Sequence, residues 1–234
     1  MNSLTMMPMS LEEIAQAVQG RLIAGTAAVN VPVATSAFTD SRQIVEGSVF
    51  VAIAGERVDG HDYVPHVGAQ GAVVAIVDHA IADAGVPQIV VENTVLALGA
   101  LAKHNIERRR ALGTPFTVVG ITGSVGKTTT KDLMKALLSH MGPTVAPVGS
   151  FNNEIGLPLT SLKVNAETRF LVAEMGANHV GEIANLTSLV PPDIAVVLKV
   201  GVAHLGEFGS PERIAQAKSE IIRGLVPGGL SVLN

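Results

Sequence analysis

The second half of the chain alternates between short β-branched apolar runs and longer segments whose apolar residues recur at helical spacing. Each short run predicts a buried strand, and each longer segment predicts a helix that covers the sheet. Regular alternation of this kind is typical of a doubly wound, mainly parallel α/β sheet, which binds ligands at the carboxyl ends of its strands. The predicted strands are residues 116–121, 143–148, 169–174, 192–199 and 230–234, and the predicted helices are 127–140, 158–162, 181–189 and 211–225.

The first half contains the same two kinds of segment in a less regular order. Ser10 and Glu13 form a capping box that opens the first helix, and Leu96 is expected on the inner side of the last one. We therefore expect a small α/β domain at residues 1–112 and a second domain at residues 113–234, incomplete at its C-terminal end. The predicted helices of the first domain are 11–18, 64–71 and 94–109, and its predicted strands are 21–25, 47–55, 72–77 and 88–91.

Composition narrows the class of protein. Hydrophobic residues make up 47% of the chain and aromatic residues only 3%, so the core is aliphatic, as in strands buried on both faces. The net charge of −4 argues against a nucleic-acid partner, and the arginine triplet at 108–110 is interpreted as a solvated helix end or linker. With no cysteine, disulfides, thiolate-bound zinc and cysteine nucleophiles are excluded. The sequence shows no secretory signal and no apolar run of the roughly 18 residues that a membrane span needs, which fits a cytosolic protein.

Residues 120–130 read Gly-Ile-Thr-Gly-Ser-Val-Gly-Lys-Thr-Thr-Thr and lie between a predicted strand and a predicted helix. Glycines allow backbone N–H groups to close around phosphate oxygens, and the helix N-terminus favours the negative charge. In such a loop Lys127 contacts the β- and γ-phosphates, and the Thr128 hydroxyl binds Mg²⁺. Ile121 stands where the usual loop has its first glycine, so this is a variant. The alternative is a glycine-rich turn before an ordinary helix.

Two further residues follow predicted strands and so lie on the expected ligand edge. Glu174 ends the strand at 169–174, where a carboxylate can bind Mg²⁺ opposite a phosphate loop. Its alternative is a surface or helix-capping glutamate. His204 follows the strand at 192–199 and is either a ligand-edge residue or a structural histidine. The other histidines are interpreted as structural or solvated, although His61 lies in a loop of interest.

Lys218 lies along the apolar stripe of the predicted helix 211–225. The ordinary interpretation is a lysine that extends its ammonium to the surface. The alternative is a lysine with a depressed pKa, whose neutral amine reacts with CO₂ to form a carbamate and so becomes a Mg²⁺ ligand. Asn152 and Asn153 lie in a polar loop and can bind a substrate or metal through their amide oxygens, or can be simple loop residues.

Taken together, these motifs resemble those of the Mur ligase family. The matching segments are 122–130, Asn-Asn-Glu-Ile-Gly at 152–156, Glu-Met-Gly-Ala at 174–177, His204, and Lys218 within Ala-Gln-Ala-Lys-Ser-Glu. The segments 151–156 and 174–183 most resemble the branch of the family that adds D-alanyl-D-alanine. Residues 40–42, 47–55 and 59–61 resemble its uridine-nucleotide-binding N-terminal domain. Lys199 departs from the pattern, since Asn or Thr is expected there.

The resemblance implies an ATP-dependent ligase that activates the carboxylate of a UDP-N-acetylmuramoyl-tripeptide as an acyl phosphate, which the amine of D-alanyl-D-alanine then attacks. It implies ATP and two Mg²⁺ ions, one held by Thr128 and Glu174 and the other by His204 and carbamylated Lys218. Lys127, His204 and Lys218 are the expected catalytic residues. The implied ATP-binding residues are Gly123, Ser124, Val125, Gly126, Lys127, Thr128 and Thr129, and the implied substrate contacts are Asp40, Ser41, Arg42, His61, Asn152 and Asn153.

Three alternatives remain at this stage: the preceding Mur ligase, which adds the third peptide residue; a folate-polyglutamate-type ligase, against which residues 40–61 argue; and a nucleotide-binding module without catalysis. The resemblance also implies a bacterial cytoplasmic protein of peptidoglycan synthesis, monomeric when complete and without nucleic-acid partner or membrane insertion. We expect a chain of this extent to bind uridine nucleotide but to ligate poorly by itself.

Overall fold

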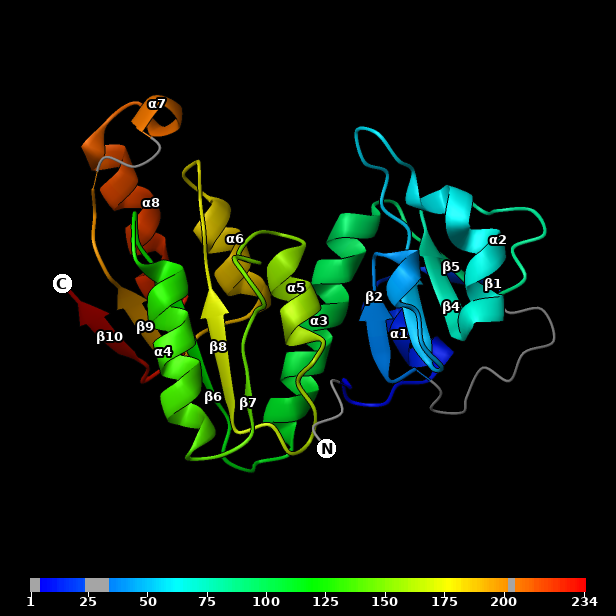
Figure 1. Cartoon of the computed structure of the whole chain (residues 1–234), viewed down its shortest axis with the longest axis horizontal. Helices are drawn as coiled ribbons and strands as arrows, with labels where there is room; N and C mark the ends of the chain where they lie inside the picture. The colour runs from blue at the N-terminus through cyan, green and yellow to red at the C-terminus, as the bar shows by residue number, and fades with distance from the viewer. Residues whose placement is uncertain (1–4, 24–33, 202–204) are drawn as a thin grey trace. The chain divides into compact units, whose positions relative to one another are not determined.

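The computed structural model describes residues 5–23, 34–201 and 205–234. The chain divides into two compact units, Met1–Asn105 and Ile106–Asn234 (Figure 1). The division falls inside helix α3 (Thr94–Ala111), earlier than the boundary expected after residue 112. The reason is that Ile106, in the last part of this helix, already packs into the hydrophobic core of the second unit.

The first unit is built on a five-stranded mixed sheet with the order β1-β5-β4-β3-β2. Strands β2 to β5 pair in parallel, and β1 pairs antiparallel with β5. The strands are β1 (Arg21–Ile23), β2 (Ser36–Phe38), β3 (Ser48–Val51), β4 (Ala72–Val77) and β5 (Gln88–Val90). The helices, besides α3, are α1 (Leu11–Ala17), η1 (Ser41–Gln43), η2 (Gly60–Tyr63), α2 (Val64–Val67) and η3 (Gly68–Gln70).

Local signals in this unit had mixed success. The predicted cap is confirmed, because Ser10 Oγ accepts a hydrogen bond from the Glu13 N–H at 3.1 Å. Strand β2 was not predicted, since its three residues show no clear alternation. The inward position expected for Leu96 is wrong: the residue is 69% exposed, whereas Leu98, two positions along α3, is fully buried.

The second unit is a five-stranded, fully parallel sheet with the order β10-β9-β6-β8-β7. This confirms the doubly wound fold that alternation predicted. Its strands are β6 (Thr117–Thr122), β7 (Thr144–Val145), β8 (Phe170–Glu174), β9 (Ile194–Val197) and β10 (Leu230–Leu233). Its helices, after α3, are α4 (Lys127–Ser139), α5 (Gly156–Ser161), α6 (Glu182–Leu189), α7 (Leu205–Phe208) and α8 (Pro211–Arg223).

Side chains of successive strand residues point to opposite sides of the sheet, so apolar strands present two apolar faces. Helices cover both of these faces. In β8, Leu171 packs into a core shared with α5, α6 and α8, whereas Val172 packs into a second core with Met134 and Leu138 of α4. The predicted strand at 143–148 is shorter than expected and forms only the two-residue edge strand β7.

Arg109 corrects the interpretation of the arginine triplet. The residue is only 1% exposed. Its guanidinium donates hydrogen bonds to the carbonyl oxygens of Thr168 at 2.7 Å and Pro115 at 2.9 Å. Arg109 is therefore a buried residue whose hydrogen bonds connect the end of α3 to the segments that lead into β6 and β8.

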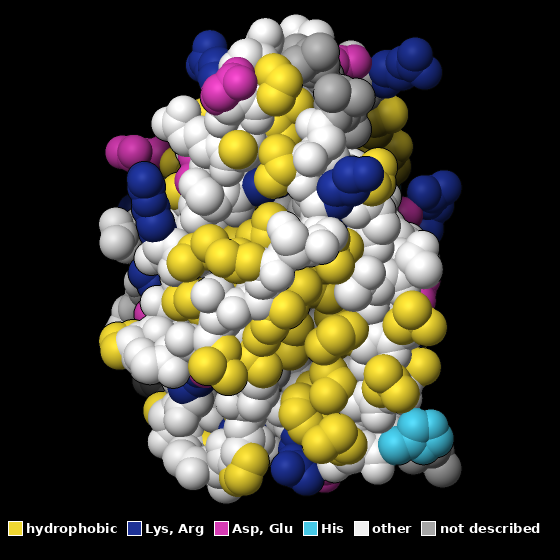
Figure 2. All heavy atoms as spheres, turned by 90° about the vertical axis from the view of Figure 1, so that its left-hand side faces the viewer, with side chains coloured by type: hydrophobic (Ala, Val, Ile, Leu, Met, Phe, Trp, Pro, Cys, Tyr) yellow, Lys and Arg dark blue, Asp and Glu magenta, His cyan; other side chains and the backbone are white. Residues whose placement is uncertain are grey.

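The outer edge of this unit is apolar. Figure 2 shows hydrophobic side chains gathered on the face where α4 and β10 lie. Leu133 and Leu137 of α4 are 61% and 67% exposed, and Leu230 and Leu233 of β10 are 65% and 61% exposed. Strand β10 thus extends the sheet through backbone hydrogen bonds without adding a buried side chain to the core.

Candidate functional site

The glycine loop connects β6 to α4 at the middle of the parallel sheet. Gly126 caps α4 with a φ of +85°, a conformation that side chains disfavour, and Lys127 is the first residue of the helix. The Ser124 N–H donates to the Lys199 carbonyl at 2.8 Å, which ties the loop to the end of β9. Lys127 Nζ donates to the Gly123 carbonyl at 2.9 Å, so the ammonium lies over the loop. The combination of strand, loop and helix start has the geometry that phosphate binding requires.

Glu174 is the last residue of β8 and lies opposite Ile121 of β6 in the sheet register. Its side chain is 1% exposed. One carboxylate oxygen accepts a hydrogen bond from Thr128 Oγ1 at 3.1 Å, and the other accepts one from Asn152 Nδ2 at 2.8 Å. The structure thus brings three predicted site residues together from the loop, the strand end and the polar loop.

This arrangement fits a magnesium ion. Burying a carboxylate is costly unless a cation or strong hydrogen bonds compensate. The two side chains that bond Glu174 are neutral, and the carboxylate and hydroxyl oxygens of Glu174 and Thr128 are the kind of ligand that Mg²⁺ prefers. A cation between them would replace the bond that they now make to each other.

The polar loop is held in place by several contacts that the sequence did not reveal. The Gly176 N–H donates to the Asn152 carbonyl at 2.9 Å, and a Cβ at Gly176 would lie 2.8 Å from the Asn152 side chain. Asn153 Oδ1 accepts the Gly156 N–H at 2.9 Å, so this amide oxygen is bound to the first residue of α5. Lys131, 2% exposed, donates from Nζ to the carbonyls of Pro147 and Gly149.

Lys218 is buried in α8, with only 3% of its surface exposed, and does not extend to the surface. Its Nζ donates to the Ala177 carbonyl at 3.2 Å and lies 5.5 Å from the centre of the Phe208 ring. Burial, together with the positive charge of Lys127, lowers the pKa of Lys218 to about 8. A pKa of about 8 leaves about a tenth of the amine neutral at pH 7, and carbamate formation requires this neutral form.

A pocket of about 580 Å³ opens beside these groups. Glu220 ends the matching segment around Lys218, but the sequence predicts no role for it. One of its carboxylate oxygens accepts the N–H of Gly181, a residue of the pocket lining, at 2.7 Å, and the other accepts the Ala184 N–H at 3.0 Å. It caps α6 from a position 39 residues away, a pairing that no local pattern signals. The pocket is lined by Lys127, Asn152, Asn153, Glu154, Gly176, Ala177, Asn178, Val180, Gly181, Glu182, Asn185 and Leu186.

The remaining predicted residues fall into three groups. Val125 and Thr129 are exposed on the glycine loop and the first turn of α4. His204 lies outside the described residues. In the first unit, Asp40 accepts two hydrogen bonds from the Arg42 side chain at 2.8 and 2.9 Å, and this pairing holds the pKa of the Asp40 carboxyl well below its usual range. Ser41 lies between them in η1, half-buried.

His61 belongs to η2, and its side chain is only 4% exposed. Its ring contacts the side chains of Asp59, Asp78 and His79, so both ring nitrogens already have a partner within the protein.

In the part of the chain that the structure describes, no helix combines the length and apolarity needed to cross a bilayer.

Comparison with known proteins is consistent across sequence and structure. The model of the Mur ligase family catalytic domain matches residues 34–106, and that of the Mur ligase middle domain matches residues 121–234. A Mycobacterium tuberculosis protein named UDP-N-acetylmuramoyl-tripeptide–D-alanyl-D-alanine ligase is 45% identical over 214 residues, which cover 83% of this chain and 41% of the relative.

Two solved structures are also similar. The crystal structure of MurF from Acinetobacter baumannii has a TM-score of 0.85 and 39% identity, covering 97% of this chain and 49% of that one. MurF ligase from Thermotoga maritima in complex with ADP has a TM-score of 0.74 and 38% identity, covering 85% and 45%. The chain thus spans less than half the length of the relatives that it matches.

Proposed function

Because the chain belongs to the Mur ligase family, we propose that it supplies the uridine-nucleotide-binding and ATP-binding parts of a ligase that joins D-alanyl-D-alanine to UDP-N-acetylmuramoyl-tripeptide. The relatives that support this proposal carry that name, and one similar structure holds ADP. The domain division we propose is a substrate domain at residues 1–112 and an ATP-binding domain at 113–234.

The observation that carries the proposal is the contact of buried Glu174 with Thr128 and Asn152 next to Lys127. Transfer of a phosphoryl group to a carboxylate brings two anions together, and positive charge must offset their repulsion. Lys127, at the start of α4, holds the terminal phosphates of ATP. The backbone and side chains of residues 123–129 surround them. Magnesium, held by Thr128 and Glu174, supplies the additional positive charge.

Lys218 is proposed to act as a carbamate. As a free ammonium it adds a second cation close to Lys127, as its lowered pKa reflects. As a carbamate it presents oxygens to a second Mg²⁺ ion, which we propose it shares with His204. Incubation with ¹³C-bicarbonate tests this step: a carbamate carbon signal is expected in the wild-type NMR spectrum and is expected to be missing in Lys218→Ala.

Asp40, Ser41, Arg42 and His61 are proposed to contact the uridine nucleotide, and Asn152 and Asn153 the peptide part. We propose that the complete protein is a monomer in the bacterial cytoplasm. The preceding ligase of the same family remains the second candidate, since it shares the first domain's expected motifs. The pocket beside Asn152, at the end of β8, is where the two ligases are expected to differ.

Calorimetric titration of the tag-free chain tests the proposal directly. We expect one site for MgATP and one for UDP, because each unit carries its own binding residues. No MgATP binding at millimolar nucleotide would refute it.

A fusion of this chain to the remaining C-terminal part of the M. tuberculosis relative separates the candidates. Phosphate release is expected with the tripeptide plus D-alanyl-D-alanine and not with the dipeptide plus diaminopimelate. The unfused chain is the matched control and is expected to turn over poorly.

A further inference from the structure

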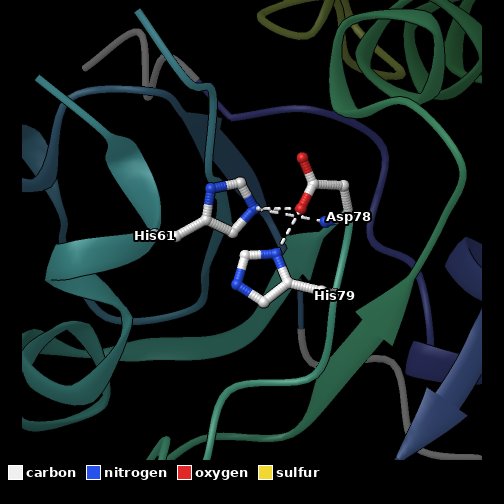
Figure 3. A group of neighbouring side chains, drawn as sticks. All are labelled: His61, Asp78 and His79. Atoms are coloured by element: carbon white, nitrogen blue, oxygen red, sulfur yellow. Dashed lines mark hydrogen bonds and ion pairs between the residues drawn. The ribbon is translucent and has the colours of Figure 1, made fainter.

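Three polar side chains of the first unit converge at the carboxyl edge of its sheet, and one of them, His61, is also among the proposed contacts of the uridine nucleotide. His61 comes from η2, and Asp78 and His79 directly follow β4 (Figure 3). Their nearest ligand-type atoms all lie within 4.8 Å of one another. The two imidazole rings stack with centroids 4.8 Å apart. Both imidazole rings therefore direct a nitrogen toward one point, the Oδ1 atom of Asp78 (Figure 3).

Asp59 determines which nitrogen of His61 faces this point. Asp59 Oδ1 lies 2.6 Å from His61 Nδ1 and also accepts the backbone N–H of His61. A carboxylate only accepts hydrogen bonds, so Nδ1 carries a ring proton, and the backbone N–H of Asp78 that points at Nε2 requires a lone pair there. Gly60 holds η2 against the sheet, because a Cβ there would lie 2.6 Å from the Ile53 backbone nitrogen.

The lone pair of His61 then faces a second acceptor. Nε2 already accepts the backbone N–H of Asp78 at 3.2 Å, and it also lies 3.2 Å from the carboxylate oxygen Oδ1 of the same residue. Oδ1 lies 2.5 Å from His79 Nδ1 as well. An acceptor nitrogen and a carboxylate oxygen that face each other repel unless a positive charge lies between them.

We propose that this cluster binds one divalent transition-metal ion of the zinc type, through His61 Nε2, Asp78 Oδ1 and His79 Nδ1. Imidazole and carboxylate ligands suit such ions. Asp59 completes the arrangement, since a carboxylate that holds the second nitrogen of a ligating histidine orients the ring and raises its basicity. The chain has no cysteine, so no thiolate competes for the ion.

Two of the three distances between the ligand atoms need little or no change, and the third, between the two imidazole nitrogens, is within 4.8 Å. Two ligand atoms at about 2 Å from a tetrahedral zinc ion lie roughly 3.3 Å apart, and His61 Nε2 and Asp78 Oδ1 are already 3.2 Å apart. His79 must move away from Asp78 by less than about 1 Å. Its side chain is 61% exposed and can do so, and the proton between the two groups is released. Asp78, 40% exposed, leaves the remaining position open to water.

Titration of metal-free, tag-free protein with zinc chloride at pH 7.5, followed by calorimetry, tests the proposal. We expect one equivalent per chain. His79→Asn and Asp78→Asn each remove a ligand and are expected to weaken binding at least about tenfold. The matched control is His66→Asn, which changes an exposed histidine of the same unit outside the cluster and is expected to bind as the wild type does.

A second measurement on the wild type does not depend on any variant folding. Zinc should shift the imidazole ¹⁵N resonances of His61 and His79 and leave those of His66 and His104 in place. The proposal is overturned if zinc in excess produces neither heat nor these shifts. It is equally overturned if folded His79→Asn binds zinc as tightly as the wild type, or if the two rings respond to pH alone.

Discussion

The two units place acidic residues at the same kind of position and surround them with opposite partners. In the second unit Glu174 ends β8, and in the first Asp78 directly follows β4; both strands run parallel to their neighbours. The second unit also has Lys127 at a helix start and buried Lys218, two cations close enough for one to lower the pKa of the other. Around Asp78 the structure places two imidazoles.

The contrast shows what each edge can bind. Cations and backbone N–H groups around a glycine loop favour binding of an anion, such as a nucleotide whose phosphates carry a bound Mg²⁺ ion. Two imidazole nitrogens directed at one carboxylate oxygen favour the metal ion itself, which takes the place of the proton that they share. The position of a strand end therefore selects where a ligand binds, and the neighbouring side chains select its charge.

Lys218→Met tests whether the buried ammonium of Lys218 lowers the free energy of unfolding, and it has the largest expected effect. The pKa of the folded-state lysine is lowered from 10.5 to about 8, a difference worth about 3 kcal/mol below pH 8. Loss of the bond to the Ala177 carbonyl offsets about 1 kcal/mol of this. We therefore expect the variant to have the larger free energy of unfolding at pH 7 in CO₂-free buffer, as measured by urea denaturation.

The pH dependence gives the sharper readout for Lys218→Met. Between pH 8 and 10.5 the unfolded wild type binds more protons than the folded form, so its unfolding free energy rises with pH. The stability difference between wild type and variant should be constant below pH 8 and shrink above it. A difference that does not change between pH 7 and pH 10 would show that Lys218 is not a destabilising buried cation.

Lys127→Met removes the cation that we place on the phosphates. A hydrogen bond to a charged group contributes about 1.5–3 kcal/mol, so MgATP affinity should fall roughly 10- to 150-fold by calorimetry. Zinc binding to the first unit should not change, since the substitution lies in the other unit. If the variant and the wild type bind MgATP equally well, Lys127 does not make the sheet edge of the second unit an anion-binding edge.

The features of the second unit that the sequence predicts correctly are of two kinds. They are either contiguous in the sequence or follow from the order of strands and helices. Loop residues 120–130 are contiguous, so strand, glycines and helix start could be recognised together. Glu174 and Thr128 are 46 residues apart, yet both follow from the rule that ligands bind at strand carboxyl ends. Whether Lys218 is buried or extended was left open, because a helix stripe does not reveal what packs against it.

Other features depend on contacts that no pattern encodes. Arg109 was expected in solvent, but its partner Thr168 is 59 residues away in a loop. The cluster of His61 with Asp78 bridges 17 residues and needs both the strand order and the tight packing at Gly60. An Asp-His pair directly after a buried strand was the available signal, and it is too common to be specific.

Asp59→Asn sharpens the comparison from the side of the first unit. The amide can no longer hold the His61 ring with a charged acceptor, so the orientation and basicity of the ligating nitrogen are lost. Zinc affinity should fall about 10- to 100-fold, the usual cost of removing a partner behind a ligating histidine. Asp62→Asn, an exposed aspartate of the same η2 segment, is the control and should bind normally. Identical effects of the two substitutions would leave Asp59 without an orienting role.

Gly126→Ala should have the smallest effect and tests the geometry of the loop itself. Gly126 adopts a φ of +85° where β6 turns into α4, and a side chain in that region costs about 1–2 kcal/mol. Space is not the limit, since the nearest atom to an added Cβ is 3.6 Å away. Amide hydrogen exchange should therefore quicken in the first turn of α4 and leave β4 of the first unit unchanged. Gly206→Ala, an open position without positive φ, is the control. If both alanines behave alike, the left-handed conformation at residue 126 is not what shapes the anion-binding edge.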